Sequence, residues 1–162
     1  MKQFEKTYEE NKKLDEIFDS LYDVNDKNII EKNILELLVE LGELANETRC
    51  FKYWSDKKPS EKEVILDEYA DCLIMVFYMC SRTKISLDEE FSIVNETNIV
   101  EQFKKLYSLV SSLNYNLDKE TIKEILSNTI NLGRLLNFSY EDITTGHIAK
   151  INRNKKRFET GF

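Results

Sequence analysis

Glycine and proline are scarce in this chain, with only four glycines and one proline among its 162 residues. Turn-rich β folds need many of both, whereas helix interiors exclude them. Apolar residues recur at helical spacing along nearly the whole chain. The sequence therefore predicts an all-α fold, a helical bundle of about six or seven helices in a single domain over residues 1–162.

Break and cap residues divide the chain into the expected helices. Ser60 with Glu63 and Ser139 with Asp142 have the spacing of capping boxes, in which a serine and an acidic residue cap each other's backbone N–H groups. Ser86 with Glu89 has the same spacing. The expected bounds are, in order, Phe4 to Leu21, Asn25 or Asp26 to about Trp54, Ser60 to about Arg82, a short helix from Ser86, and helices from Asn95 or Thr97, from Asp118 and from Ser139.

Four glutamates share one face of the second expected helix, namely Glu36, Glu40, Glu43 and Glu47. Like charges at this spacing repel, and no lysine or arginine lies between Lys32 and Arg49. A divalent cation would neutralise the stripe, since magnesium prefers hard oxygen ligands. The stripe therefore predicts a metal site, with a structural acidic face as the alternative.

The third expected helix adds Glu68 and Asp71, followed by a run over residues 72–80 that is apolar on all sides. A helix with such a run is buried, so the unpaired carboxylate of Asp71 at its edge would be costly without a cation. If the two helices fold back as an antiparallel hairpin, Glu43 faces Glu68 and Glu40 faces Asp71. These four residues are the predicted metal ligands.

The charge of the chain is uneven. The net charge is −7, which argues against nucleic-acid binding. Residues 147–162 nevertheless carry five basic residues and one acid, and this basic tail suits an anionic ligand held against the metal site. A solvated tail is the alternative. The only histidine, His147, is expected on a helix surface.

Cellular context follows from the apolar segments and the cysteines. No stretch approaches the length of a membrane span, and no secretory signal opens the chain. The three cysteines lie among apolar neighbours and are expected to be reduced core residues. We therefore expect a cytoplasmic protein without a membrane partner.

Three stretches have a familiar pattern: residues 40–47 (ELGELANE), 49–54 (RCFKYW) and 68–73 (EYADCL). Near the end of the chain, Lys150, Asn154, Arg157 and Gly161 repeat a spacing that accompanies this pattern. Together these residues resemble the dimeric all-α dUTPases, which belong to the MazG-like group of nucleotide pyrophosphohydrolases. The hairpin motif is shared by the whole group, and the other segments are more specific to dUTPases.

The resemblance implies a homodimer that hydrolyses dUTP to dUMP and pyrophosphate, with dUDP as a further candidate substrate. It implies two or three magnesium ions on Glu40, Glu43, Glu68 and Asp71, with Glu43 or Glu47 accepting a proton from water. It also implies that residues 147–162 close as a lid. The implied substrate contacts are Lys52, Lys150 and Arg157 to the phosphates, and Asn11, Trp54, Asn154 and Phe162 to the nucleoside.

Several positions depart from the family pattern. Asn11 stands where glutamine commonly contacts the base, Ile74 where some members have histidine, Phe158 where glutamine is frequent and Phe162 where tyrosine is common. A related hydrolase for dCTP or a modified nucleotide therefore stays open. A further alternative is a helical module that binds a nucleotide or a protein without turnover. For Trp54 the alternative to a nucleoside contact is a core or interface aromatic.

Overall fold

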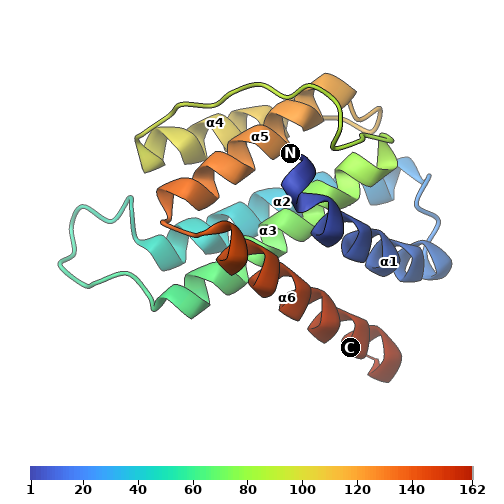
Figure 1. Cartoon of the computed structure of the whole chain (residues 1–162), viewed down its shortest axis with the longest axis horizontal. Coiled ribbons are helices and arrows are strands. Elements are labelled where there is room, and N and C mark those ends of the chain that lie inside the picture. Colours follow the sequence, from blue (N-terminus) through green and yellow to red (C-terminus); the bar gives the residue numbers. More distant parts are fainter. Residues whose placement is uncertain (162) are drawn as a thin grey trace.

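The computed structural model describes residues 1–161. Within this range the chain forms six α-helices, one short 3-10 helix and no strand. The elements are η1 Lys2–Phe4, α1 Glu5–Leu21, α2 Lys27–Thr48, α3 Lys62–Arg82, α4 Ile99–Ser112, α5 Lys119–Leu135 and α6 Tyr140–Thr160. The predicted all-α bundle is confirmed (Figure 1). None of the described helices is long and apolar enough to cross a membrane.

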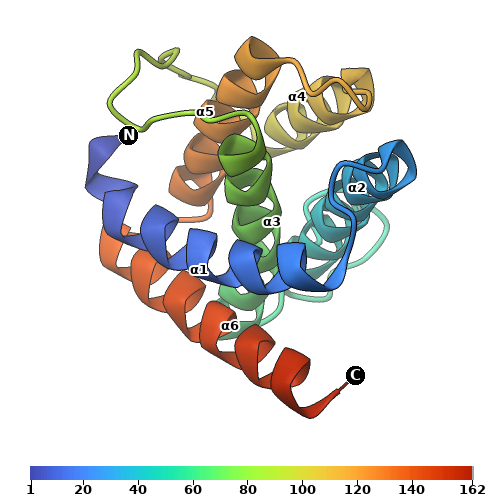
Figure 2. The ribbon, with the colours of Figure 1, turned by 90° about the vertical axis from the view of Figure 1, so that its right-hand side faces the viewer.

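Helix α3 forms the centre of the bundle. Its residues from Tyr69 to Cys80 are almost all buried, because the run is apolar on every side and each side meets another helix. Helices α1, α2, α5 and α6 pack against α3, while α4 contacts α2 and α5. Figure 2 shows α3 enclosed by these neighbours.

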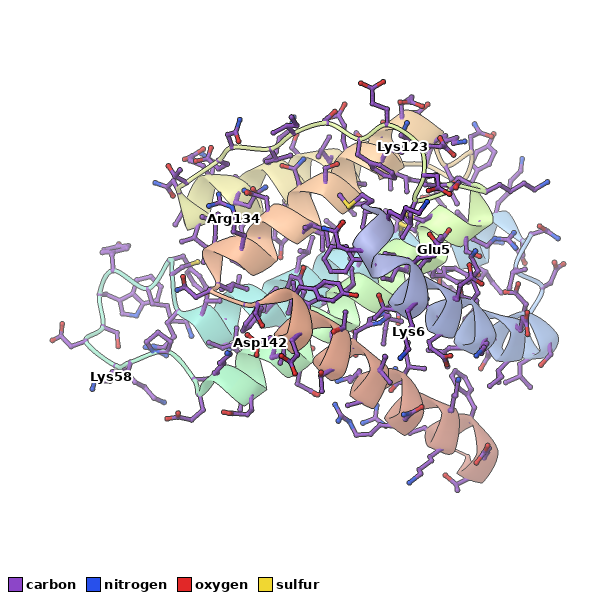
Figure 3. The ribbon with its side chains drawn as sticks, in the orientation of Figure 1. Glu5, Lys6, Lys58, Lys123, Arg134 and Asp142 are labelled. Atoms are coloured by element: carbon purple, nitrogen blue, oxygen red, sulfur yellow. The ribbon has the colours of Figure 1, made fainter. Side chains whose placement is uncertain are left out.

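Helices α2 and α3 form the antiparallel hairpin that the sequence predicts (Figure 1). Their connection, residues 49–61, extends beyond the bundle, and Lys58 lies on its outer part, away from the helices (Figure 3). Helix α2 ends at Thr48 rather than near Trp54. Arg49 adopts the left-handed conformation with a φ of 57°, and its N–H bonds back to the carbonyls of Ala45 and Asn46, which is a common way to end a helix.

The expected capping box at Ser60 is wrong. Helix α3 has Glu61 as its N-cap, without a side-chain cap bond among the described residues. The Ser60 hydroxyl donates instead to the Glu47 carboxylate, and the Ser60 N–H donates to the Glu47 carbonyl at 3.1 Å. Ser60 therefore fastens the end of the connection to the last turn of α2.

The expected short helix after Ser86 is also wrong, since residues 86–89 form only a turn. The Ser86 N–H does donate to the Glu89 carboxylate at 2.9 Å. The same carboxylate, however, pairs with Lys119 of α5 at 2.9 Å. The local hydrogen bond thus closes one turn, and the chain then continues without helix or strand to α4.

The remaining helix starts follow their caps. Helix α4 begins after Asn98, whose side chain accepts from two backbone N–H groups, rather than after Asn95 or Thr97. The other expected N-caps are confirmed by side-chain hydrogen bonds, namely Asp26, Asp118 and the complete capping box of Ser139 with Asp142.

Helix α6 lies along α1 and α3 (Figure 2). It includes residues 147–160 of the basic tail. The expectation of a surface histidine is wrong, because His147 is 0% exposed. Its ring packs edge-on against Phe77 of α3, with 5.3 Å between the ring centroids. The His147 side chain of α6 is thus buried against both α1 and α3.

Candidate metal centre and adjoining pocket

Three of the four predicted metal ligands meet between α2 and α3. One carboxylate oxygen from each of Glu40, Glu68 and Asp71 lies within 4.8 Å of the others, and all three residues are half-buried. Glu40 comes from α2, and the other two come from consecutive turns of α3. Hard oxygen donors in this arrangement suit a divalent cation such as magnesium.

Without a cation, burial and mutual repulsion disfavour the ionised form of these three carboxylates. Burial first, and then the charges of the neighbouring carboxylates with Asp71 foremost, together raise the pKa of Glu40 to about 7. Burial followed by Asp71 raises the pKa of Glu68, and burial raises the pKa of Asp71 against the effect of Lys150. A bound divalent cation would favour the ionised carboxylates and reverse these shifts.

The two predicted catalytic glutamates lie on the loop side of this group. Glu43 is exposed and outside the cluster of three, but its charge contributes to the raised pKa values of Glu40 and Glu68. Glu47 lies one turn further along α2, where Ser60 donates to its carboxylate. Glu43 is therefore the nearer of the two to the cluster.

A lysine occupies the α6 side of the cluster. Lys150 is 7% exposed, donates to Asp67 at 2.8 Å and forms an ion pair with Asp71. Burial lowers the pKa of Lys150, but its bonds to the two aspartates outweigh this and raise it overall. Asp67, which also pairs with Arg153, was not singled out in the sequence, where it directly precedes Glu68.

Two further residues of the tail face the same region from α6. Asn154 lines a pocket beside the cluster. Arg157 is exposed, and its charge acts on Asp71 by lowering the pKa of that carboxyl, against the larger effect of burial. Lys150, Asn154 and Arg157 share one side of α6, because their spacing of four and three residues matches the helical repeat.

The α2–α3 connection has two predicted substrate contacts, Lys52 and Trp54, and both lie outside the pocket beside the cluster. Lys52 donates to the Asn46 side chain. Trp54 is 64% exposed and packs edge-on against Tyr53 and Phe51. Neither Lys52 nor Trp54 lines the pocket beside the cluster. Phe162, the last predicted contact, lies outside the described residues.

The pocket beside the cluster has a volume of about 120 Å³ and is lined by residues of α1, α2, α3 and α6. Glu40 and Asp71 form part of its wall, so it opens directly onto the candidate metal centre. Ile74 and Phe158, two of the positions that depart from the family pattern, contribute apolar wall. The polar wall further from the cluster comes from Asp15, Asn33 and Tyr78.

Asn11 is buried behind this pocket and does not line it. Its amide nitrogen donates to Asp15 at 3.0 Å and to the Ile74 carbonyl at 3.3 Å. Its oxygen lies 2.9 Å from Nε2 of His147. The side chain that the resemblance assigns to the base is therefore engaged within the protein.

Sequence reasoning missed Asp15, Asn33 and Tyr78 as pocket residues. A signal existed for Asp15, because it lies four and eleven residues after Asn11 and Phe4, on the buried side of α1. A carboxylate on that side needs a partner or a ligand. Asn33 and Tyr78 gave no comparable signal. They lie within the long helices α2 and α3, and the sequence of one helix does not show which other helix packs against each of its sides.

An all-α bundle with clustered carboxylates on an antiparallel helix pair, beside a small pocket, defines a helical protein with a candidate divalent-cation centre. A family model described as dUTPase matches residues 3–162. The chain therefore belongs to this dUTPase family, and the resemblance to the all-α dUTPases is confirmed. A search of curated proteins found no match.

Proposed function

We propose that this protein hydrolyses dUTP to dUMP and pyrophosphate with magnesium in the cytoplasm, where its three free cysteines would stay reduced. The observation that carries the proposal is the group of Glu40, Glu68 and Asp71, two of which, Glu40 and Asp71, line a pocket, in a chain that a dUTPase family model matches over nearly its full length.

Glu40, Glu68 and Asp71 would hold the metal, with Glu43 at the edge of the group and two or three ions in total. Magnesium bound there would neutralise phosphate charge and lower the pKa of a water molecule at the site. Glu43 is better placed than Glu47 to accept the proton of that water, because Glu47 is hydrogen-bonded to Ser60.

The basic side of α6 would hold the phosphates. Lys150 already lies against the cluster through Asp71, and Arg157 is exposed on the same side of the helix. A phosphate oxygen offers the same kind of acceptor that Lys150 now finds on Asp71, and Arg157 can add a bidentate contact. The lid role of residues 147–162 is proposed on this ground.

We also propose a homodimer. Apolar side chains are exposed on α2 and on the connection after it, including Leu35 at 60%, Val39 at 50% and Trp54 at 64%. Contact with a second copy would cover such side chains. It would also give Lys52 and Trp54, which project from one chain, a route to substrate held by the other.

A second candidate is the hydrolysis of a related nucleotide such as dCTP. It is favoured by Asn11, which does not reach the pocket, and by the apolar Ile74 in the pocket wall. The rest of the proposed mechanism is the same for either base, since the metal centre and α6 act on the phosphates.

The test offers each nucleoside triphosphate and deoxynucleoside triphosphate, and dUDP, to the purified protein with magnesium while pyrophosphate or phosphate release is measured. Turnover of dUTP above the others supports the first candidate, and preference for another base supports the second. Absence of turnover with all of them rejects both. Glu40→Gln should abolish turnover, and Glu63→Gln, an exposed glutamate in the first turn of α3, should not.

A further inference from the structure

The wall of the pocket away from the metal centre contains polar atoms that lack a protein partner. Asp15 is 6% exposed, and its Oδ2 atom has no hydrogen-bond partner among the described residues. Tyr78 is 7% exposed, and its hydroxyl also lacks a partner of normal geometry within residues 1–161, with the Asn33 amide close by. Buried polar groups are nearly always hydrogen-bonded, so these atoms indicate a ligand.

A hydrogen-bonded chain fixes which oxygen of Asp15 is left for that ligand. The Ile74 carbonyl can only accept, so the Asn11 amide nitrogen must face it, and the same nitrogen donates to Asp15 Oδ1 at 3.0 Å. The Asn11 oxygen then faces His147, whose Nε2 must carry the proton it donates over 2.9 Å.

His147 suits this role because it stays neutral. Burial lowers the pKa of His147 to about 3, so at ordinary pH the ring holds one proton, on Nε2. Asn11 therefore cannot turn its amide around without losing two of its three bonds. The result is an aspartate in the pocket wall with one oxygen held by the protein and the other without a hydrogen-bond partner among the described residues.

The distance from the metal centre suits a nucleoside. Tyr78 follows Asp71 by seven residues on α3, which at 1.5 Å per residue places it about 10 Å further along the helix. A ligand with its phosphates at the carboxylate cluster would extend its base towards Asp15 and Tyr78. The volume of about 120 Å³ lies well below the roughly 300–1,000 Å³ of drug-sized sites and favours a single ring.

We propose that Asp15 is the residue that reads the base, accepting at Oδ2 a hydrogen bond from an N–H on the pairing edge of a pyrimidine, and that Asn11 and His147 are positioning residues. This inference deepens the proposed function and rests on it for the orientation of the nucleotide. The Tyr78 hydroxyl would serve the acceptor that adjoins this N–H. Uracil and cytosine both offer an N–H beside an acceptor, and the experiment distinguishes them.

Asp15→Asn is the sharpest variant, because it keeps the size of the side chain and exchanges an acceptor for a donor. Asn11 can continue to donate to the remaining oxygen at position 15, so the new amide N–H₂ faces the pocket and opposes the N–H of the base. Asp19→Asn is the matched control, since Asp19 lies one turn further along α1 and pairs with Arg82 outside the pocket.

The experiment measures kcat/KM for dUTP and dCTP with the wild type and both variants at pH 8.5, where Asp15, with its pKa raised by burial to about 7, is ionised. We expect Asp15→Asn to lower kcat/KM for the preferred base by roughly 10- to 100-fold, the loss typical of a hydrogen bond to a charged group, and to reduce the ratio between the two bases. Asp19→Asn should keep both values. An equal loss for both bases would assign Asp15 to the sugar or to structure and overturn the inference.

Binding of deoxyuridine and deoxycytidine without metal provides a readout that needs no turnover. We expect the wild type to bind one of them and Asp15→Asn to bind it at least 10-fold more weakly, with Tyr78→Phe showing a smaller loss. A wild type without turnover would reject the proposed function alone, because nucleoside binding still tests Asp15. Equal affinity of the wild type and Asp15→Asn, or no binding of either nucleoside by the wild type, would overturn the inference.

Discussion

Lys150 of α6 forms an ion pair with Asp71 of α3, inside the group of carboxylates that would hold the metal. The ammonium thus occupies the place where cationic charge is needed. A divalent cation on Asp71 competes with Lys150 for that carboxylate, and a phosphate drawn in with the cation offers Lys150 a new acceptor. On the proposed function, metal binding and substrate binding would therefore be coupled through one side chain.

Replacing Lys150 should separate these two effects. In Lys150→Gln the cation no longer competes with an ammonium, so we expect magnesium to bind several-fold more tightly in calorimetric titration without nucleotide. The same variant should lower kcat/KM for the nucleotide by at least about 10-fold, because a charged contact to phosphate is lost. Lys155→Gln, which removes a lysine 3.8 Å from Glu10, is the control. Unchanged magnesium affinity in Lys150→Gln would contradict the coupling.

Glu40→Gln should abolish activity and increase the stability of the metal-free protein. Burial and neighbouring carboxylates disfavour its charge, so without metal the neutral side chain should raise the free energy of unfolding at pH 8 by about 1 kcal/mol. Turnover should be lost, because a proposed metal ligand is removed. Urea unfolding in EDTA and activity with magnesium test the two halves. A variant that is less stable in EDTA would show that Glu40 is not under electrostatic strain.

Asp15 should make stability depend on pH in a defined window. Burial raises the pKa of Asp15 to about 7, above the value of about 3.9 for an unfolded chain. Between these values the folded state binds a proton that the unfolded state lacks, so the contribution of Asp15 to stability is full below pH 4 and is lost as the pH rises through 7.

The difference between Asp15→Asn and the wild type isolates this contribution. We expect the variant to gain stability relative to the wild type as the pH rises from 4 to 7.5, by on the order of 2–4 kcal/mol. Urea unfolding at several pH values in EDTA measures the difference. A difference that does not change with pH would mean that Asp15 titrates normally in the folded protein.

Gly42 lies where α4 approaches α2 closely. A Cβ at Gly42 would lie 2.9 Å from the Tyr107 hydroxyl, which donates to the Leu38 carbonyl at 3.0 Å. Gly42→Ala should therefore destabilise the protein by about 1–3 kcal/mol through overpacking. Tyr107→Phe removes the clashing oxygen, so the double variant should lose less than the sum of the single variants. Additive losses in urea unfolding would place the strain elsewhere.

The helices and the hairpin could be predicted because their signals are local. Apolar spacing marks the helices, and Asp118 and Ser139 cap their helices as the pattern indicates. The facing of Glu40 and Asp71 follows from antiparallel pairing alone. Each of these inferences needs only the geometry of a helix and of one connection.

Other features depend on partners from distant parts of the chain. Ser60 has the spacing of a cap, but it serves Glu47, which the spacing cannot reveal. Asn11 resembles a base contact by its position in the sequence, yet its side chain is hydrogen-bonded to His147. A sequence pattern does not show whether a buried polar side chain has a hydrogen-bond partner elsewhere in the chain. The pocket residues likewise come from four helices, and no single helix predicts them.

The hydrogen bond between Asn11 and His147 joins residues 136 positions apart. The first and last helices must therefore both be in place before Asp15 is oriented at the pocket. During synthesis the nascent chain carries the α2–α3 hairpin long before α6 has emerged, and contacts of such long range form late and slowly. Nucleoside binding should thus appear only at the end of folding, which would make it a time marker for completion of the native chain.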